Sequence, residues 1–262
     1  MNFETILNNS VNFTRDTLPG KWTRWLVLTL LGLPGALLPF ALGIGNMTDK
    51  TSFHWELVHW DQVAALAILM LLASFFLSGY IVRIYRGGAT PPVFDAWGGM
   101  FLDGIKMCVV WLIWMLPALI LMLVACISLF GATAAGGHSP AGLGLLGLML
   151  ILLLAALIMV VVAVVLGTIG AIRFARTGSV MEGVNYHEIL ATIRRIGWWD
   201  YIIAGIVLMV IALVFAIVSG ILGLVPFIGW VLVLIISPLM TVLSARFLSL
   251  VYDTGVPPAP AG

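Results

Sequence analysis

The sequence has very few charged residues. Only 9% of its 262 residues are Asp, Glu, Lys or Arg, and 62% are hydrophobic, whereas soluble domains average about 25% charged residues. We therefore exclude a soluble protein. An excess of either charge is also missing, because 12 basic residues face 11 acidic ones. Without a sequence-wide basic surface to neutralise phosphates, nucleic acid is excluded as a partner.

Cysteine is scarce as well. Cys108 and Cys126 lie 18 positions apart in one apolar run, which corresponds to about 27 Å along a helix. That separation is too long for a disulfide within the helix. The two thiols therefore give no information about the redox compartment.

Four long stretches contain no Asp, Glu, Lys or Arg, and they define the predicted spans. A bilayer core needs about 20 apolar residues per helix. The first two stretches are long enough for one span each, whereas the third contains a Gly-, Ser- and Pro-rich break at 131–142 and the fourth contains Pro226. The stretches are residues 25–48, 62–82, 107–172 and 201–245.

The fold class that follows is an all-α integral membrane protein with six transmembrane helices in a single membrane domain, residues 1–262. Each of the two longer stretches is predicted to form two helices joined by a turn. The turn near Pro226 is short and apolar. A re-entrant pair that does not reach the far side therefore stays open for residues 201–245.

Basic residues predict the orientation, because Lys and Arg in short loops stay on the cytoplasmic side. Lys50 falls on one side of the predicted spans, and eleven basic residues fall on the other. We therefore expect a multi-pass protein of the cell membrane with both termini in the cytoplasm. The eleven are Arg15, Lys21, Arg24, Arg83, Arg86, Lys106, Arg173, Arg176, Arg194, Arg195 and Arg246.

Three segments with apolar residues at helical spacing lead into the predicted pairs of spans. They begin near Phe3, Phe94 and Met181, and each pair of spans ends in a segment with arginine. We expect three amphipathic helices on the cytoplasmic surface and three parallel repeats of one surface helix plus a two-span hairpin. The alternative is that arginines merely mark the inner ends of unrelated spans. The predicted repeats are residues 1–88, 89–178 and 179–255, followed by a flexible tail, 256–262.

The segment from Gly79 to Lys106 reads GYIVRIYRGGATPPVFDAWGGMFLDGIK. It resembles the signature of a mostly archaeal family of polytopic membrane proteins catalogued as domain of unknown function 4013. The resemblance implies a multi-pass membrane protein. It implies no activity and provides no catalytic residues to transfer.

Two motifs resemble known sites only superficially. His54 and His59 flank a Glu, but their spacing of five differs from the spacing of four that places two histidines on one helix face in a zinc site. The segment from Gly142 to Gly147 fits G-x-G-x-x-G, yet no strand precedes it and no acidic residue follows about 20 positions later. We predict no metal and no cofactor.

Glycines in the spans are interpreted as helix-packing positions, because small residues let backbones approach in membranes. No Asp, Glu, Lys or Arg lies in a predicted span core, so the groups that usually serve coupled transport or intramembrane catalysis are missing. The hydroxyls there lack an activating partner, so we predict no enzyme and no catalytic residues. The packing glycines are Gly142, Gly147, Gly167, Gly170, Gly220 and Gly223.

Acidic residues at the inner ends alternate with basic ones, and ion pairing and solvation are their expected roles. These residues are Asp95, Asp103, Glu182, Glu188 and Asp200. Basic residues at the same ends are predicted to contact anionic lipid headgroups. The predicted lipid contacts are Lys21, Arg24, Arg83, Arg86, Arg173, Arg176, Arg194, Arg195 and Arg246.

The function predicted from these patterns is non-catalytic. We expect a scaffold or accessory subunit whose partners are membrane lipids and either further copies of itself or another membrane protein. The alternative is a channel or facilitator for a small neutral or weakly polar solute.

Overall fold

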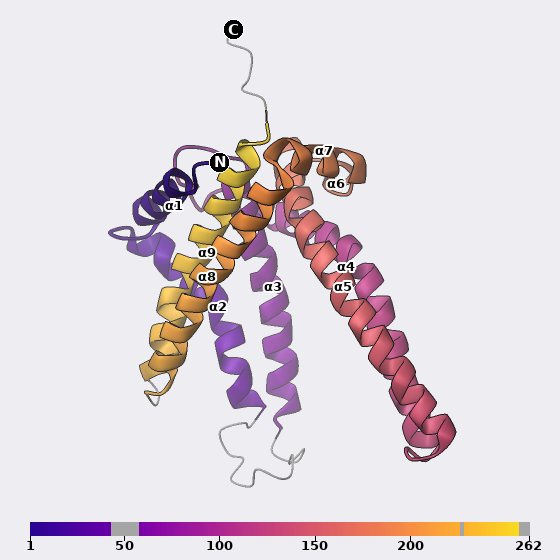
Figure 1. Ribbon diagram of the computed structural model, residues 1–262. Helices are drawn as coiled ribbons and strands as arrows, with labels where there is room; N and C mark the ends of the chain where they lie inside the picture. Colours follow the sequence, from indigo (N-terminus) through magenta and orange to yellow (C-terminus); the bar gives the residue numbers. More distant parts are fainter. Residues whose placement is uncertain (43–57, 226–227, 257–262) are drawn as a thin grey trace. The chain divides into compact units, whose positions relative to one another are not determined.

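A computed structural model describes residues 1–42, 58–225 and 228–256, and within these ranges the fold is entirely helical (Figure 1). Helices make up 85% of the described residues, which confirms the all-α prediction. The helices are α1 (Phe3–Thr17), α2 (Trp22–Ala41), α3 (Trp60–Tyr85), α4 (Trp97–Ala134), α5 (Pro140–Thr177), α6 (Val180–Gly183), α7 (Tyr186–Ile196), α8 (Trp198–Gly223) and α9 (Ile228–Asp253).

Five helices are long and apolar enough to cross a membrane: α3, α4, α5, α8 and α9. The apolar part of α2 is shorter, Trp22–Leu38. Helices α8 and α9 have 26 residues each, about 39 Å at 1.5 Å per residue, which exceeds a bilayer core of about 30 Å. Their lengths therefore suit full spans, although residues 226–227 of the predicted turn lie outside the described residues.

The break predicted at residues 131–142 is confirmed but shorter. Helix α4 continues to Ala134, and α5 begins at Pro140. Ser139 caps α5, because its hydroxyl accepts a hydrogen bond from the Gly142 amide at 3.0 Å, and proline suits the first helical position because it has no amide to leave unpaired. The turn thus needs only the residues between Ala134 and Pro140.

The second predicted surface helix is not separate. Residues from Trp97 onward form the first turns of α4, which runs for 38 residues without a break. No proline occurs between Trp97 and Pro117, and nothing therefore stops the amphipathic segment from continuing into the span. By contrast, Gly197 ends α7 with a φ of 97°, a conformation that glycine adopts easily.

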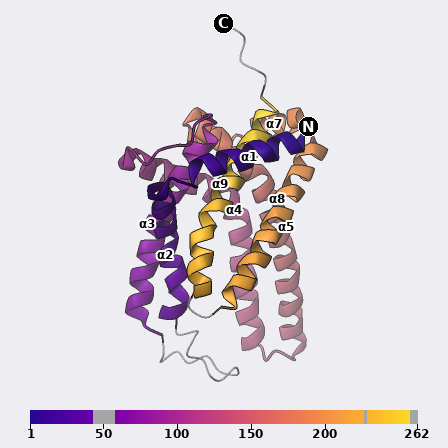
Figure 2. The same cartoon turned by 90° about the vertical axis from the view of Figure 1, so that its left-hand side faces the viewer.

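The chain forms two compact units, residues 1–106 with 193–262 and residues 107–192. In the first unit α9 is central, because it contacts α1, α2, α3 and α8. Figure 2 shows α1 lying across α9 rather than along it. In the second unit Gly167 of α5 lies against Trp111 and Trp114 of α4, and α6 packs on α5.

Buried side chains concentrate at one end of the long helices. In α5 the buried residues cluster from Leu166 to Ala175, the end that carries Arg173 and Arg176. In α3 the cluster runs from Gly79 to Tyr85, beside Arg83. The arginine-rich ends are therefore the packed part of each unit.

Helix α9 contains Pro238, which has no amide hydrogen to donate to the carbonyl of Leu234. The Ser237 hydroxyl donates to that carbonyl instead, at 2.9 Å. The adjacent carbonyl, of Ile235, accepts a hydrogen bond from the indole of Trp25 in α2 at 2.6 Å. Helix α9 therefore stays continuous across the proline.

Candidate functional site at the arginine-rich helix ends

Arg83 fastens the end of α3 to the segment that leads into α4. Its Nη1 donates to the carboxylate of Asp95 at 2.5 Å and to the carbonyl of Val93 at 2.6 Å, and its Nη2 donates to the carbonyl of Asp95 at 2.7 Å. The Arg83 side chain is only 14% exposed. A planar guanidinium can hold several oxygens at once in this way.

Arg86 adds a second link one turn later, because its Nη2 lies 2.6 Å from the carboxylate of Asp103 in α4. Glycines bring the two helices together at the same place. A Cβ added at Gly79 would lie 1.9 Å from the carbonyl oxygen of Met100, and one added at Gly104 would lie 1.8 Å from that of Phe75. The α3–α4 crossing is thus a backbone contact that two glycines permit.

Arg173 has the same role in the second unit. Its guanidinium donates to Glu182 of α6 and lies 3.5 Å from the carboxylate of Glu188 in α7, while its side chain is 13% exposed. The hydrogen bond from Arg173 is the main cause that lowers the pKa of Glu182 below its ordinary value. Arg173 thereby fastens the end of α5 to the two short helices that follow.

Arg246, near the end of α9, contacts two other parts of the first unit. Its Nη1 donates to the carbonyl of Gly88 at 3.0 Å, and its guanidinium lies 4.6 Å from the ring centre of Phe13 in α1. This is a cation–π contact. It helps to hold α1 across α9.

These contacts refine the predicted lipid-binding set. Arg83, Arg86, Arg173 and Arg246 bind protein groups, and the expected ion pairing of the inner carboxylates is confirmed for the four acids above and for Asp200, which lies 3.4 Å from the N-terminal amine. Headgroup contact at the arginines stays a prediction. The exposed members of the set include Lys21, Arg176, Arg194 and Arg195.

Arg24 makes no ion pair among the described residues. Its Nη1 is buried and has no hydrogen-bond partner, and the same is true of the hydroxyl of Tyr80 in α3 and of the Nε atoms of Arg173 and Arg246, whose other nitrogens are bonded. Arg24 and Tyr80 belong to two helices, α2 and α3, that pack against each other. Sequence reasoning missed Tyr80, because an aromatic residue near a span end is typical of the membrane interface.

Three of the predicted packing glycines make close contacts in the second unit. At Gly170 an added Cβ would lie 2.2 Å from the carbonyl oxygen of Gly183, which also accepts a hydrogen bond from the Trp114 indole at 3.1 Å. At Gly167 it would lie 3.2 Å from the Trp111 ring, and at Gly142 it would lie 3.1 Å from the carbonyl oxygen of Gly137.

The other three, Gly147, Gly220 and Gly223, have no neighbour within 4 Å of an added Cβ in the described part of the chain. Packing there stays a prediction that concerns contacts with another molecule. Sequence reasoning missed Gly104 and Gly183, which lie outside the predicted span cores. Gly104 lies three positions before the apolar stretch 107–172, and Gly183 lies seven positions after Arg176.

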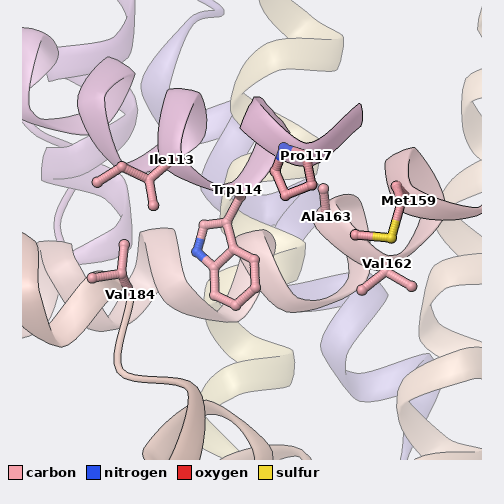
Figure 3. A pocket seen from close by; sticks show the side chains of 7 residues that line it. All are labelled: Ile113, Trp114, Pro117, Met159, Val162, Ala163 and Val184. Atoms are coloured by element: carbon pink, nitrogen blue, oxygen red, sulfur yellow. The ribbon is translucent and has the colours of Figure 1, made fainter. Parts of the chain in front are cut away.

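A cavity of about 220 Å³ lies in the second unit between α4, α5 and Val184 (Figure 3). Pro117 leaves the carbonyl of Ile113 without a helical donor, and the Trp114 indole closes one side. The lining side chains are Ile113, Trp114, Pro117, Met159, Val162, Ala163 and Val184. This composition suits an apolar group such as part of an acyl chain, and it offers no acid or base.

A second apolar groove, of about 490 Å³, lies between α1, α8 and α9. Val11, Phe215 and Met240 line it, and Arg15 lies at its edge. Arg15 was counted among the inner basic residues but not among the predicted lipid contacts.

Two of the hydroxyls in the spans bind their own helices. Ser128 donates to the carbonyl of Val124 at 3.0 Å, and Thr168 donates to that of Val164 at 2.7 Å. In residues 1–42, 58–225 and 228–256, no group of three or more His, Cys, Asp or Glu side chains could hold a metal ion. Most of the His54–His59 motif lies outside these ranges, as does Lys50.

Comparison with known proteins identifies a family and nothing more specific. No curated protein and no solved structure matches the chain significantly. One family profile matches residues 63–224, more than half of the sequence, including the segment from Gly79 to Lys106 on which the predicted resemblance depended. The chain belongs to the family described as protein of unknown function (DUF4013).

Proposed function

We propose that this protein is a non-catalytic scaffold or accessory subunit of the cell membrane, which holds lipids and membrane partners against its spans. The observation that carries the proposal is the exposure of the long helices. In the most apolar 18-residue segment of α5 only 11% is buried inside the protein, and in that of α8 only 6% is buried. Such surfaces need lipid or another apolar helix beside them.

The distribution of packing supports the same conclusion. Each unit packs most tightly at its arginine-rich end, where ion pairs fix the short helices and loops, whereas the apolar lengths of the spans stay open to neighbours. A coupled transporter or an intramembrane enzyme needs polar groups at membrane depth. The span hydroxyls named above donate to carbonyls of their own helices instead.

The proposed architecture keeps six spans, with α2 as the sixth. Trp22–Leu38 is apolar, and α2 packs against α3 and α9, as a span beside spans would do. The surface helices are α1, which lies across α9 (Figure 2), and α7, with the first turns of α4 in the corresponding place. We also propose that these helices and both termini are cytoplasmic, because basic residues in short loops favour that side, and that the repeats are residues 1–88, 89–178 and 179–255.

The test is the composition of the complex in native lipid. We expect protein extracted into polymer nanodiscs to run as a homo-oligomer or with a stoichiometric membrane partner, measured by mass photometry and mass spectrometry. The exposed glycines of α8 provide the variant: Gly220→Leu should reduce the assembly by crowding its contact face. Ile221→Leu is the matched control, because Ile221 is already large and 61% exposed.

A lone monomer that conducts ions or passes a neutral solute in sealed liposomes would contradict the scaffold and support the facilitator. An assembly that is unaffected by Gly220→Leu would place the partner on another face of the spans.

A further inference from the structure

Among the buried polar atoms without a hydrogen-bond partner in the first unit, two come from neighbouring helices, α2 and α3. Arg24 lies in the first turn of α2, and Tyr80 lies near the end of α3. Helix α2 begins and α3 ends at the same end of the pair (Figure 2). The Nη1 atom of Arg24 and the hydroxyl of Tyr80 are both buried without a hydrogen bond, to each other or to any described residue.

Packing fixes the Tyr80 side chain, so its hydroxyl cannot simply turn to solvent. The Tyr80 side chain is completely buried, and its ring stacks on Phe94 at 4.6 Å between centres. Beside it, Gly79 packs against the backbone of Met100. The residue after Arg24 is Trp25, whose indole is held by the Ile235 carbonyl.

The charge balance around this place is positive. Arg83 is paired with Asp95, but among the described residues no carboxylate pairs with Arg24. A guanidinium nitrogen that is buried without a hydrogen-bond partner is costly, and so is a buried hydroxyl without one. Both groups are hydrogen-bond donors, and one oxygen-rich anion would satisfy both.

We infer that Arg24 and Tyr80 form a binding site for a phosphate group. Guanidinium groups recognise phosphate oxygens by charge-assisted hydrogen bonds, and the Tyr80 hydroxyl donates a further bond. Because Tyr80 is neutral, the pair carries the single positive charge of Arg24. This charge matches the single negative charge of a phosphodiester. The inference rests on the proposed membrane function only for the source of the phosphate, a lipid headgroup rather than the free ion.

The experiment measures ligand-dependent thermal unfolding of the full-length protein in dodecyl maltoside, which contains no phosphate. The probes are dioleoylphosphatidylglycerol, dioleoylphosphatidylcholine and inorganic phosphate, each titrated at constant ionic strength. We expect phosphatidylglycerol to raise the unfolding midpoint. Its apparent affinity should fall at least about tenfold in Tyr80→Phe, which is the loss expected for one hydrogen bond to a charged group, and further in Arg24→Gln.

Lys106→Gln is the matched control, because it removes one positive charge from an exposed residue of the first unit that is not among the predicted lipid contacts. Its affinity should stay within about threefold of the wild type. An equal loss in Lys106→Gln would reduce the effect to surface charge and overturn the site.

The ligand-free protein gives a second readout. Tyr80→Phe keeps the stacked ring and removes only the unpartnered hydroxyl, so without lipid it should be at least as stable as the wild type. A lower midpoint without lipid would show that the hydroxyl has a partner inside the protein, and this result would also overturn the inference.

The three probes separate the sources. A response to either lipid that both variants lose supports a headgroup site, and a response to inorganic phosphate alone supports the same site with a soluble ligand. No response of the wild type to any probe refutes the site. That refutation would leave the scaffold intact, because the assembly in nanodiscs is measured independently, and a monomer in nanodiscs would likewise leave the phosphate site standing.

Discussion

The α3–α4 crossing makes a quantitative prediction for Gly104→Ala. The new Cβ would lie 1.8 Å from the carbonyl oxygen of Phe75, whereas ordinary contacts begin at about 3.4 Å. The two backbones would therefore have to separate by about 1.6 Å. The opposing atom belongs to a helix backbone and cannot rotate away, as a flexible side chain could.

Overpacking of this kind costs about 1–3 kcal/mol or more, and the lack of a rotatable neighbour places Gly104→Ala at the upper end. Replacing glycine by alanine in a helix returns up to about 1 kcal/mol. We expect a net loss of about 2 kcal/mol in the free energy of unfolding. At Gly205 in α8 an added Cβ meets nothing within 4 Å, so Gly205→Ala should be neutral or slightly stabilising.

The assay compares the two variants by fluorescence-detected size exclusion after heating in detergent. The midpoint of Gly104→Ala should lie at least about 5 °C below that of Gly205→Ala, since about 1 kcal/mol corresponds to roughly 2–4 °C in a domain of this size. Equal midpoints would refute the close α3–α4 crossing. A loss in Gly205→Ala alone would instead indicate a contact with a second molecule on α8.

Three further predictions concern charge, pH and transport. Arg173→Gln should destabilise the protein more than Arg194→Gln in the same heating assay, because Arg173 is paired with Glu182 and Glu188 whereas Arg194 is exposed; similar losses would contradict the internal role of Arg173. The lowered pKa of Glu182 contributes stability that is present above its ordinary value of 4.5 and is lost as the pH falls through the lowered value. Glu182→Gln should therefore be less stable than the wild type at neutral pH, and the two proteins should become equally stable in acid. Parallel profiles of stability against pH would exclude this linkage. Protein in sealed liposomes should show no proton- or sodium-driven uptake, since no charged residue lies in the predicted span cores; reproducible coupled uptake would overturn the non-transporter assignment.

Orientation is tested separately by cysteine labelling. In a variant that lacks both native cysteines, a cysteine at Ser139 should react with an impermeant thiol reagent in whole cells, and one at Thr90 should not. The reverse labelling pattern would invert the proposed topology.

The sequence was informative where the physical signal is local. Apolar run length located the helices, and the cluster from Gly136 to Pro140 located a turn, because span length and turn chemistry depend on neighbouring residues. The fusion of the second surface segment into α4 was missed because amphipathic spacing does not show where a helix ends. A helix-breaking residue would show it, but the first proline after Trp97 is Pro117.

The candidate site was less predictable because its contacts join distant residues. The sequence shows that arginines gather at the span ends, but nothing local reveals that Arg83 binds the segment before α4 while the Nη1 of Arg24 has no hydrogen-bond partner. Gly79 and Gly147 both lie in apolar stretches that contain no charged residue. Only the fold distinguishes the glycine at a helix crossing from the one beside open space.

The contact between Trp25 and the broken ladder of α9 has a consequence for the order of assembly. The donor and the Ile235 carbonyl are 210 residues apart, and at about 5–20 residues per second a ribosome needs roughly 10–40 s to make that length. Helix α2 is therefore finished long before the proline-containing helix leaves the tunnel. The Trp25 indole has therefore already been made when α9 appears, and it can donate to the Ile235 carbonyl near Pro238 as α9 packs beside α2. Trp25→Phe should therefore delay the integration of α9 during synthesis more than it lowers the stability of the finished protein.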